Sequence, residues 1–196
     1  MKTKMCILAL LVVIAFSPSM LGQEKIPAGV VHGPKAGFKI SAPEGWVVDN
    51  EAGVNQDLPC VLYPKGSSWA DAKTVMYAKV ASPQWEGVNA FVAWAIQGMK
   101  EKRGTPKEKI ASGKTKDGHD YFINEYPATK TYSQWERVGY VQLPQGVAYI
   151  VLTSRDQASY QKDSGVLEKV LKTLVYIEPK SEVASGQEFA HRYRQL

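Results

Sequence analysis

The most constraining feature of the sequence is a pair of apolar runs joined by a short turn. Residues 137–143 and 147–153 are rich in Val, Tyr, Ile and Leu, and a Pro-Gln-Gly step separates them. Such residues favour strands, and so short a connection joins antiparallel neighbours. The pattern therefore predicts a hairpin at the buried centre of a sheet.

Shorter extended runs flank this hairpin on both sides. Alternation or a high content of β-branched residues marks residues 38–40, 46–48, 60–63, 74–80, 109–111, 119–126 and 174–177. Asp117-Gly118 predicts a second hairpin, and a Pro-Glu-Gly step predicts a turn between the first two runs. Because short turns join most of these strands, the sheet should be mainly antiparallel.

Two segments change to helical spacing. Within residues 88–102, Phe91, Trp94 and Ala95 lie three and four positions apart, and a similar stripe covers residues 156–171. We assign Trp94 to the core on this basis, together with Trp46. A mainly antiparallel sheet covered by two amphipathic helices is an α+β fold rather than a doubly wound one.

The N-terminus has the layout of a secretory signal peptide over residues 1–22. Lys2 and Lys4 precede an uncharged apolar run over residues 5–16, which is too short for the roughly 20 residues that span a bilayer. An uncleaved anchor or a buried helix is the alternative. Cleavage would remove both lysines, lower the formal charge from +5 to +3 and leave a soluble protein in the periplasm or outside the cell.

The remaining chain divides into three parts. We expect a flexible lead at 23–36, a domain at 37–178 and a polar tail at 179–196. Of the 2 Cys, only Cys60 remains after cleavage, and its apolar run predicts a buried, unreactive thiol. With a single Cys and 3 scattered His, we expect no internal disulfide, no metal site and no cofactor.

Three blocks of the sequence resemble a known family. Residues 37–46 read Gly-Phe-Lys-Ile-Ser-Ala-Pro-Glu-Gly-Trp, which is similar to the opening motif of the PsbP-like sandwich. The helix with Phe91 and Trp94 follows at a similar distance. Residues 146–154, followed by Tyr160, resemble the closing strand and helix of that family.

The resemblance extends over residues 37–177 and implies a PsbP-like α/β/α sandwich. The family includes the extrinsic photosystem II subunit PsbP, a Ran-binding import factor and many exported bacterial proteins. Thr173-Leu174 departs from the family pattern, which leaves the last strand open. Members are mostly non-enzymatic binding or accessory proteins, but a fold alone fixes no activity.

Catalytic motifs are sparse. Residues 109–115 end like a phosphate-binding loop, but Glu108 stands where the first Gly belongs, and we reject that interpretation. His119 with Asp120 or Glu125 is the nearest approach to an acid–base pair, and a small exported hydrolase using it is our alternative hypothesis. Because strand neighbours point to opposite faces, the structural interpretation of His119 is favoured.

A basic run offers the other candidate surface. Residues 100–116 carry a net charge of +5, from Lys100, Lys102, Arg103, Lys107, Lys109, Lys114 and Lys116 against two Glu. It would attract an acidic protein surface, a polyanion or, weakly, the lipid headgroups of an anionic membrane. Lysines that end a helix also complement its dipole without any partner. Export argues against nucleic acid.

Three aromatic residues in polar segments complete the candidate site. Trp69, Tyr132 and Trp135 lie in loops or next to them, where aromatic side chains either mark a recognition surface or cover the edge of a core. Our leading hypothesis is a non-enzymatic envelope protein. It would bind a partner protein or a small ligand through these residues and the basic run, at one end of the sheet.

Overall fold

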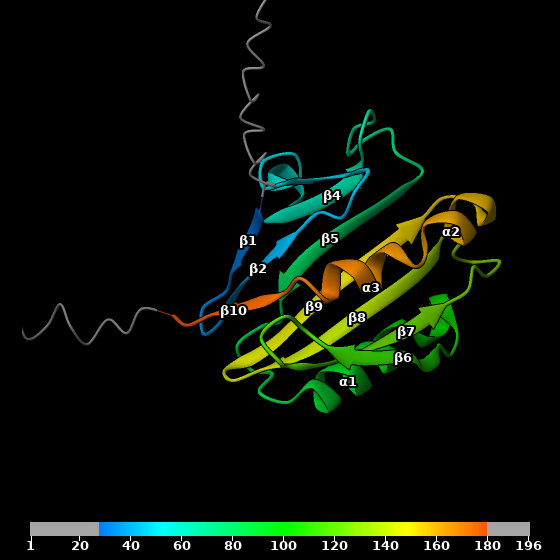
Figure 1. The fold of residues 1–196 in the computed structure, drawn as a ribbon. Helices are drawn as coiled ribbons and strands as arrows, with labels where there is room; N and C mark the ends of the chain where they lie inside the picture. Colours follow the sequence, from blue (N-terminus) through cyan, green and yellow to red (C-terminus); the bar gives the residue numbers. More distant parts are fainter. Residues whose placement is uncertain (1–27, 180–196) are drawn as a thin grey trace, which may run out of the picture.

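The computed structural model describes residues 28–179, which form two antiparallel sheets and three helices (Figure 1). In chain order the elements are β1 (Ala28–His32), β2 (Gly37–Ser41), β3 (Trp46–Asp49), the 3-10 turn η1 (Val54–Gln56), β4 (Cys60–Pro64), β5 (Thr74–Val80), α1 (Val88–Arg103), β6 (Lys107–Lys114), β7 (Asp120–Tyr126), β8 (Trp135–Leu143), β9 (Gly146–Ser154), α2 (Gln157–Asp163), α3 (Val166–Leu171) and β10 (Val175–Ile177). The predicted signal segment lies outside the described residues, as does the predicted tail beyond Pro179.

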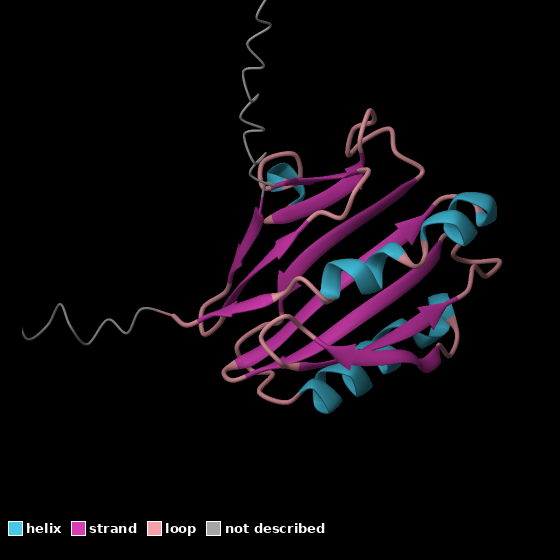
Figure 2. Ribbon diagram, viewed as in Figure 1, coloured by secondary structure: helices cyan, strands magenta, loops and turns pink. Residues whose placement is uncertain are grey.

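The larger sheet has seven strands in the order β3-β4-β5-β9-β8-β7-β6, and every neighbouring pair is antiparallel. Its centre is the predicted β8–β9 hairpin, in which Val138 lies opposite Val151. Figure 2 shows these long central strands crossing the whole domain. The predicted mainly antiparallel α+β class is confirmed.

The smaller sheet, in the order β1-β2-β10, corrects two expectations. The lead at 23–36 was expected to be flexible, yet its residues 28–32 form β1, paired along β2. The runs at 38–40 and 46–48 were expected to flank a single turn, but β2 and β3 belong to different sheets. Thr173 contributes to this arrangement, because its hydroxyl accepts the Ser41 amide at 2.9 Å and fixes the end of β2.

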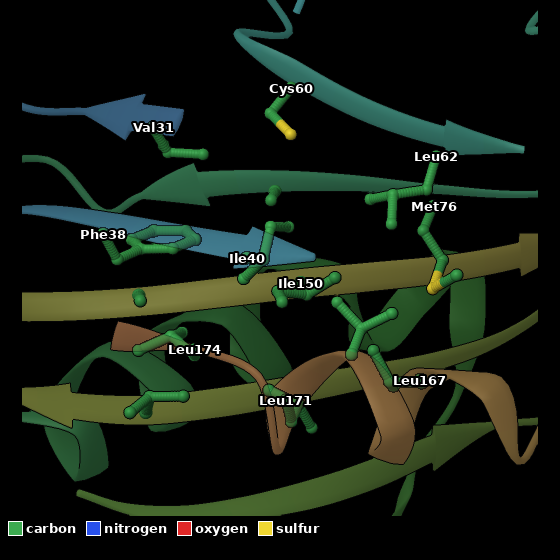
Figure 3. Close-up of a cluster of buried hydrophobic side chains, with 14 of the residues drawn as sticks. Val31, Phe38, Ile40, Cys60, Leu62, Met76, Ile150, Leu167, Leu171 and Leu174 are labelled. Carbon is green, nitrogen blue, oxygen red and sulfur yellow. The ribbon is translucent and has the colours of Figure 1, made fainter. Parts of the chain in front are cut away.

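Both faces of the larger sheet are buried. Figure 3 shows one core, where side chains of the two sheets and α3 point toward one another. The other face packs under α1, mainly against β8 and β9. The described residues contain no helix that is long and apolar enough to cross a membrane.

Two helical expectations need correction. The single helix expected over 156–171 is two helices, α2 and α3, separated at Ser164 and Gly165, both poor helix formers. Trp94 is 55% exposed rather than in the core. Phe91 and Ala95 already fill the contact between α1 and the sheet, so Trp94 lies beside it; Trp46, by contrast, packs partly buried against the core.

Candidate functional site

A groove lies between α1, the sheet and the loops at one end of the strands. It consists of two adjoining cavities, of about 290 and 200 Å³, and both are lined by Tyr77 and Glu136. We call the first the loop cavity and the second the helix cavity. Their sizes together reach the range of small-molecule sites, which is roughly 300–1,000 Å³.

The two cavities differ in chemistry. The loop cavity is further lined by Gln56, Leu58, Trp69, Lys73, Val75, Tyr132, Gln134, Thr153 and Arg155. The helix cavity is further lined by Phe91, Trp94, Ala95, Met99, Arg103, Val138, Tyr140, Tyr149 and Val151. One end of the groove is therefore polar and carries two cations, and the other end is apolar and aromatic.

A buried ion pair lies between the two ends. The guanidinium of Arg103, the last residue of α1, pairs with the carboxylate of Glu136 on β8, and their side chains are 8% and 7% exposed. Burial lowers the pKa of Arg103, but the hydrogen bond and charge of Glu136 more than offset this and raise it above its ordinary value. The opposite charges of Arg103 and Glu136 balance, so the pair adds no net charge to the groove.

Tyr132 covers this ion pair. The Arg103 guanidinium carbon lies 4.0 Å from the centre of the Tyr132 ring, and the Tyr132 hydroxyl donates to Glu136 Oε1 at 2.7 Å. Burial raises the pKa of Tyr132, and its hydrogen bond to Glu136 adds to the effect. Tyr132 thus remains a neutral donor that orients the carboxylate.

The end of α1 positions Tyr132. Gly104, at a φ of 68°, ends the helix, and the hydroxyls of Thr129 and Thr131 donate to the Lys102 carbonyl at 3.0 and 2.7 Å. These bonds satisfy a carbonyl that the helix end leaves free. They also hold the 127–134 loop against α1, which places Tyr132 over the ion pair.

The mouth of the loop cavity is formed by Trp69, Lys73 and Arg155. The Arg155 guanidinium donates to the Ala70 carbonyl at 2.9 Å, which holds the Trp69 loop in place. Lys73 lies 3.5 Å from Asp156 and its side chain is 73% exposed. Among residues 28–179, no carboxylate pairs with Arg155, so the mouth keeps a net positive charge.

The residues of the basic run differ in their surroundings. Arg103 is buried, Lys107 pairs with Glu125 at 3.2 Å, and Lys114 pairs with Asp120 at 2.7 Å. The four remaining lysines are exposed; they are Lys100, Lys102, Lys109 and Lys116. They are spread from the end of α1 along β6 to the following hairpin, because an extended strand separates residues that are near in sequence.

Trp135 lies on the opposite face of the sheet from Trp69 and Tyr132. Its ring stacks on Tyr160 of α2, with centroids 5.3 Å apart, and it packs against the core. Beside it, Arg137 donates to Glu125 Oε2 from Nε at 3.1 Å and from Nη2 at 2.9 Å, and Tyr160 donates to the same oxygen. This cluster attaches α2 to the sheet.

The structure does not assemble the predicted hydrolytic pair. His119 lies 3.6 Å from Asp117 and edge-on to Tyr176, at the tip of the β6–β7 hairpin. Glu125 lies six residues along the extended chain, roughly 20 Å away at the usual rise per residue. Asp120 pairs with Lys114, and Asp117, the carboxylate that lies near His119, accepts hydrogen bonds from the Thr115 hydroxyl and the Tyr176 amide. The predicted pairing of His119 with Asp120 or Glu125 is therefore not formed.

Two other expectations concern reactive groups. Cys60 is fully buried, and burial, with a smaller effect of the Asp49 charge, raises the pKa of its thiol to about 12. The predicted buried thiol is confirmed. Within residues 28–179, no three His, Cys, Asp or Glu residues lie close enough together to hold a metal ion.

Sequence reasoning missed the residues that join the two cavities. Tyr77 lies in the predicted run 74–80, and Glu136 lies just before the predicted run 137–143; neither position indicated a cavity. Arg103 was predicted as part of a basic surface, but it is buried in an ion pair with Glu136. No signal in the sequence distinguishes Glu136 from the polar residues around it, such as Gln134 and Arg137.

Comparisons with known proteins give a likeness of fold. No family model matches the chain, and no curated protein matches it. The solution structure of cyanobacterial PsbP from Synechocystis sp. PCC 6803 is similar, with a TM-score of 0.47 and 12% identity, covering 80% of this chain and 96% of that chain. The likeness concerns the fold alone.

Proposed function

We propose that the chain is an exported, non-enzymatic binding protein that holds a ligand or a partner segment in the groove beside α1. The observation that carries this proposal is the ion pair of Arg103 and Glu136 under Tyr132. It lies where a cationic cavity adjoins an apolar one, and its opposite charges balance. Such a combination of apolar surface and a few fixed polar groups is typical of binding sites.

The lining of the groove supports binding over catalysis. No His, Cys, Ser or Asp is among the residues that line the two cavities. The one lining carboxylate, Glu136, is held by Arg103, and the Thr153 hydroxyl donates to Gln134 at 2.7 Å. A nucleophile needs an adjacent base, and the groove provides no such pair.

A thermal-shift screen tests the binding function. A chemically diverse panel of small molecules is applied to the wild type, to Trp69→Ala and to Tyr132→Phe, with Lys39→Gln in the smaller sheet as control. Compounds that stabilise the wild type should lose their effect in the first two variants and keep it in the control, because only bound ligand raises the melting temperature. Equal shifts in all four proteins would exclude the groove as the site.

Export is the second part of the proposal and rests on residues 1–22. The test is fractionation of a bacterial host that expresses the full chain with a C-terminal tag, followed by mass measurement of the N-terminus. We expect a processed protein in the periplasm or the medium, with a new terminus near Gly22. Full-length protein beginning at Met1 in the cytoplasm would contradict export.

A further inference from the structure

The groove follows the strands of the larger sheet from the loop end toward the middle of α1. On β9 its lining passes through Tyr149, Val151 and Thr153 to Arg155, every second residue. Six residues of strand extend roughly 20 Å. A ligand that used both cavities would therefore be elongated.

The cationic end suits a single carboxylate. Arg155 has no acidic partner among the described residues, and Lys73 has only the partly buried Asp156 at 3.5 Å. The amide of Gln134 and the indole of Trp69 line the same cavity. An arginine next to a lysine provides directional donors for a carboxylate, and such charge-assisted bonds are stronger than neutral ones.

The other end suits an apolar group. Trp94 is 55% exposed, and its ring lies 5.2 Å from Trp85 and 6.0 Å from Phe91. Phe91 in turn contacts Tyr149, with centroids 5.2 Å apart. A large aromatic surface left in water gains free energy when an apolar group covers it.

The middle of the groove carries no net charge. Arg103 and Glu136 neutralise each other, and the Tyr77 side chain lines both cavities. Burial, with a smaller contribution from the charge of Glu136, raises the pKa of Tyr77, so that its ring remains neutral. The apolar body of a ligand can therefore cross this region without lying beside an unpaired charge.

We infer that the groove binds a small carboxylic acid with an elongated apolar body, its carboxylate at Arg155 and Lys73 and its body across Tyr77 against Trp94. This inference rests on the proposed binding function and specifies the class of ligand. A small molecule fits better than a protein segment, because the loop cavity has a volume of only about 290 Å³ and is lined by both the Trp69 loop, which Arg155 holds, and the sheet.

Calorimetric titration with three probes of equal chain length tests the inference. Decanoate, 1-decanol and decyltrimethylammonium are titrated into the full chain at concentrations at which each is dissolved as a monomer. We expect decanoate to bind about tenfold or more tightly than the alcohol, and the ammonium compound not to bind at the groove. Equal affinity for the three probes would overturn the assignment of a carboxylate.

Variants locate the two ends of the ligand. Arg155→Gln with Lys73→Gln should remove the preference for decanoate over decanol, whereas Trp94→Ala should weaken both probes. Lys39→Gln, an exposed lysine in the smaller sheet, is the matched control and should change neither. Decanoate binding that survives the double substitution unchanged would overturn the inference.

The outcome is separable from that of the proposed function. If panel compounds bind through Trp69 and Tyr132 while decanoate does not bind, the ligand class is wrong and the binding function stands. A short peptide ending in Leu that binds where decanoate fails would likewise replace the small acid. If neither decanoate nor any panel compound depends on the groove, both proposals fail.

Discussion

Arg103 shows how a cation is kept inside this domain. Its guanidinium has one carboxylate partner, Glu136, and the ring of Tyr132 against one face. A buried ion pair of this kind gains little net stability over apolar residues of similar size, because both ions lose their hydration. What it provides is a fixed position for α1, β8 and the 127–134 loop at the centre of the groove.

Removal of one partner alone should be costly. Arg103→Met leaves Glu136 charged and buried, and we expect the free energy of unfolding to fall by about 3–5 kcal/mol. The double variant Arg103→Met with Glu136→Leu removes both charges and should recover most of that loss. Urea unfolding of the wild type, both single variants and the double variant provides the measurement. A loss below about 1 kcal/mol in Arg103→Met would show that Glu136 is not held in a dry site.

Glu125 should make the fold sensitive to acid. Burial raises the pKa of this carboxyl, but hydrogen bonds from Tyr160, Arg137 and Lys107 bring it below its ordinary value of 4.5. The unfolded chain then takes up a proton at a higher pH than the folded chain does. The stabilisation is therefore complete above the unfolded pKa and is lost as the pH falls through the folded one.

The measurement is the free energy of unfolding between about pH 6 and about pH 3. We expect Glu125→Gln to be less stable than the wild type at the upper end and to show a flatter decline below about pH 4.5. Glu44→Gln, which makes the same change of charge in an exposed turn, is the control and should follow the wild type. A Glu125→Gln curve parallel to the wild type would contradict this role.

At the scale of elements, α3 depends on a glycine in β8. A Cβ atom at Gly139 would lie 2.5 Å from Leu171 Cδ1 and 3.1 Å from its Cγ, and Leu171 is fully buried. The absent side chain lets the helix approach the sheet closely. Gly98 in α1 differs, since nothing lies within 4 Å of the corresponding position.

Alanine substitutions should separate these two roles. Gly139→Ala forces Leu171 aside in a packed core, and we expect a loss of about 1–3 kcal/mol in the free energy of unfolding. Gly98→Ala relieves the helix of a flexible residue and should gain about 0.5–1 kcal/mol. Thermal unfolding of both variants provides the comparison. A neutral Gly139→Ala would mean that α3 packs more loosely on β8.

At the scale of the whole molecule, the sequence predicted the strands better than their grouping. Alternation and turns located the β8–β9 hairpin and the seven other predicted runs, because these signals are local. The separation of β2 from β3 depends on long-range pairing of β2 with β1 and β10, which leaves no local mark. β1 escaped notice because its alternation is only five residues long and is surrounded by Pro and Gly.

The candidate site was predictable only in part. Trp69 and Tyr132 stand out as aromatic residues in polar loops, and they line the same cavity. Trp135 is also an aromatic residue in a polar segment, yet its side chain lies on the other face of the larger sheet from this cavity. Successive residues of a strand point to opposite faces, and it is the next residue, Glu136, that lines the cavity. Arg103 and the lysines of the basic run are all cations, but they differ in burial and in ion pairing. Those differences depend on partners that are distant in sequence, such as Glu136 for Arg103.

The distribution of positive charge over the whole molecule determines how strongly it binds an anionic membrane. Two of the lysines in the basic run, Lys107 and Lys114, are paired, and β6 separates the exposed ones by up to roughly 20 Å. At physiological salt, charges further apart than about 8 Å are largely screened from each other, so these cations do not act as one patch.

We therefore expect negligible binding to an anionic membrane at physiological salt. We expect the purified chain, lacking residues 1–22, to remain unbound when it is floated with vesicles that contain phosphatidylglycerol. Each lysine held close to such a surface would contribute about 1 kcal/mol of binding free energy. A patch of four or more lysines would therefore carry the protein into the floating vesicle fraction. Phosphatidylcholine vesicles are the lipid control, and Lys100→Glu with Lys102→Glu is the protein control. Retention that requires phosphatidylglycerol and disappears in this double variant would show that the end of α1 is a membrane-binding surface after all.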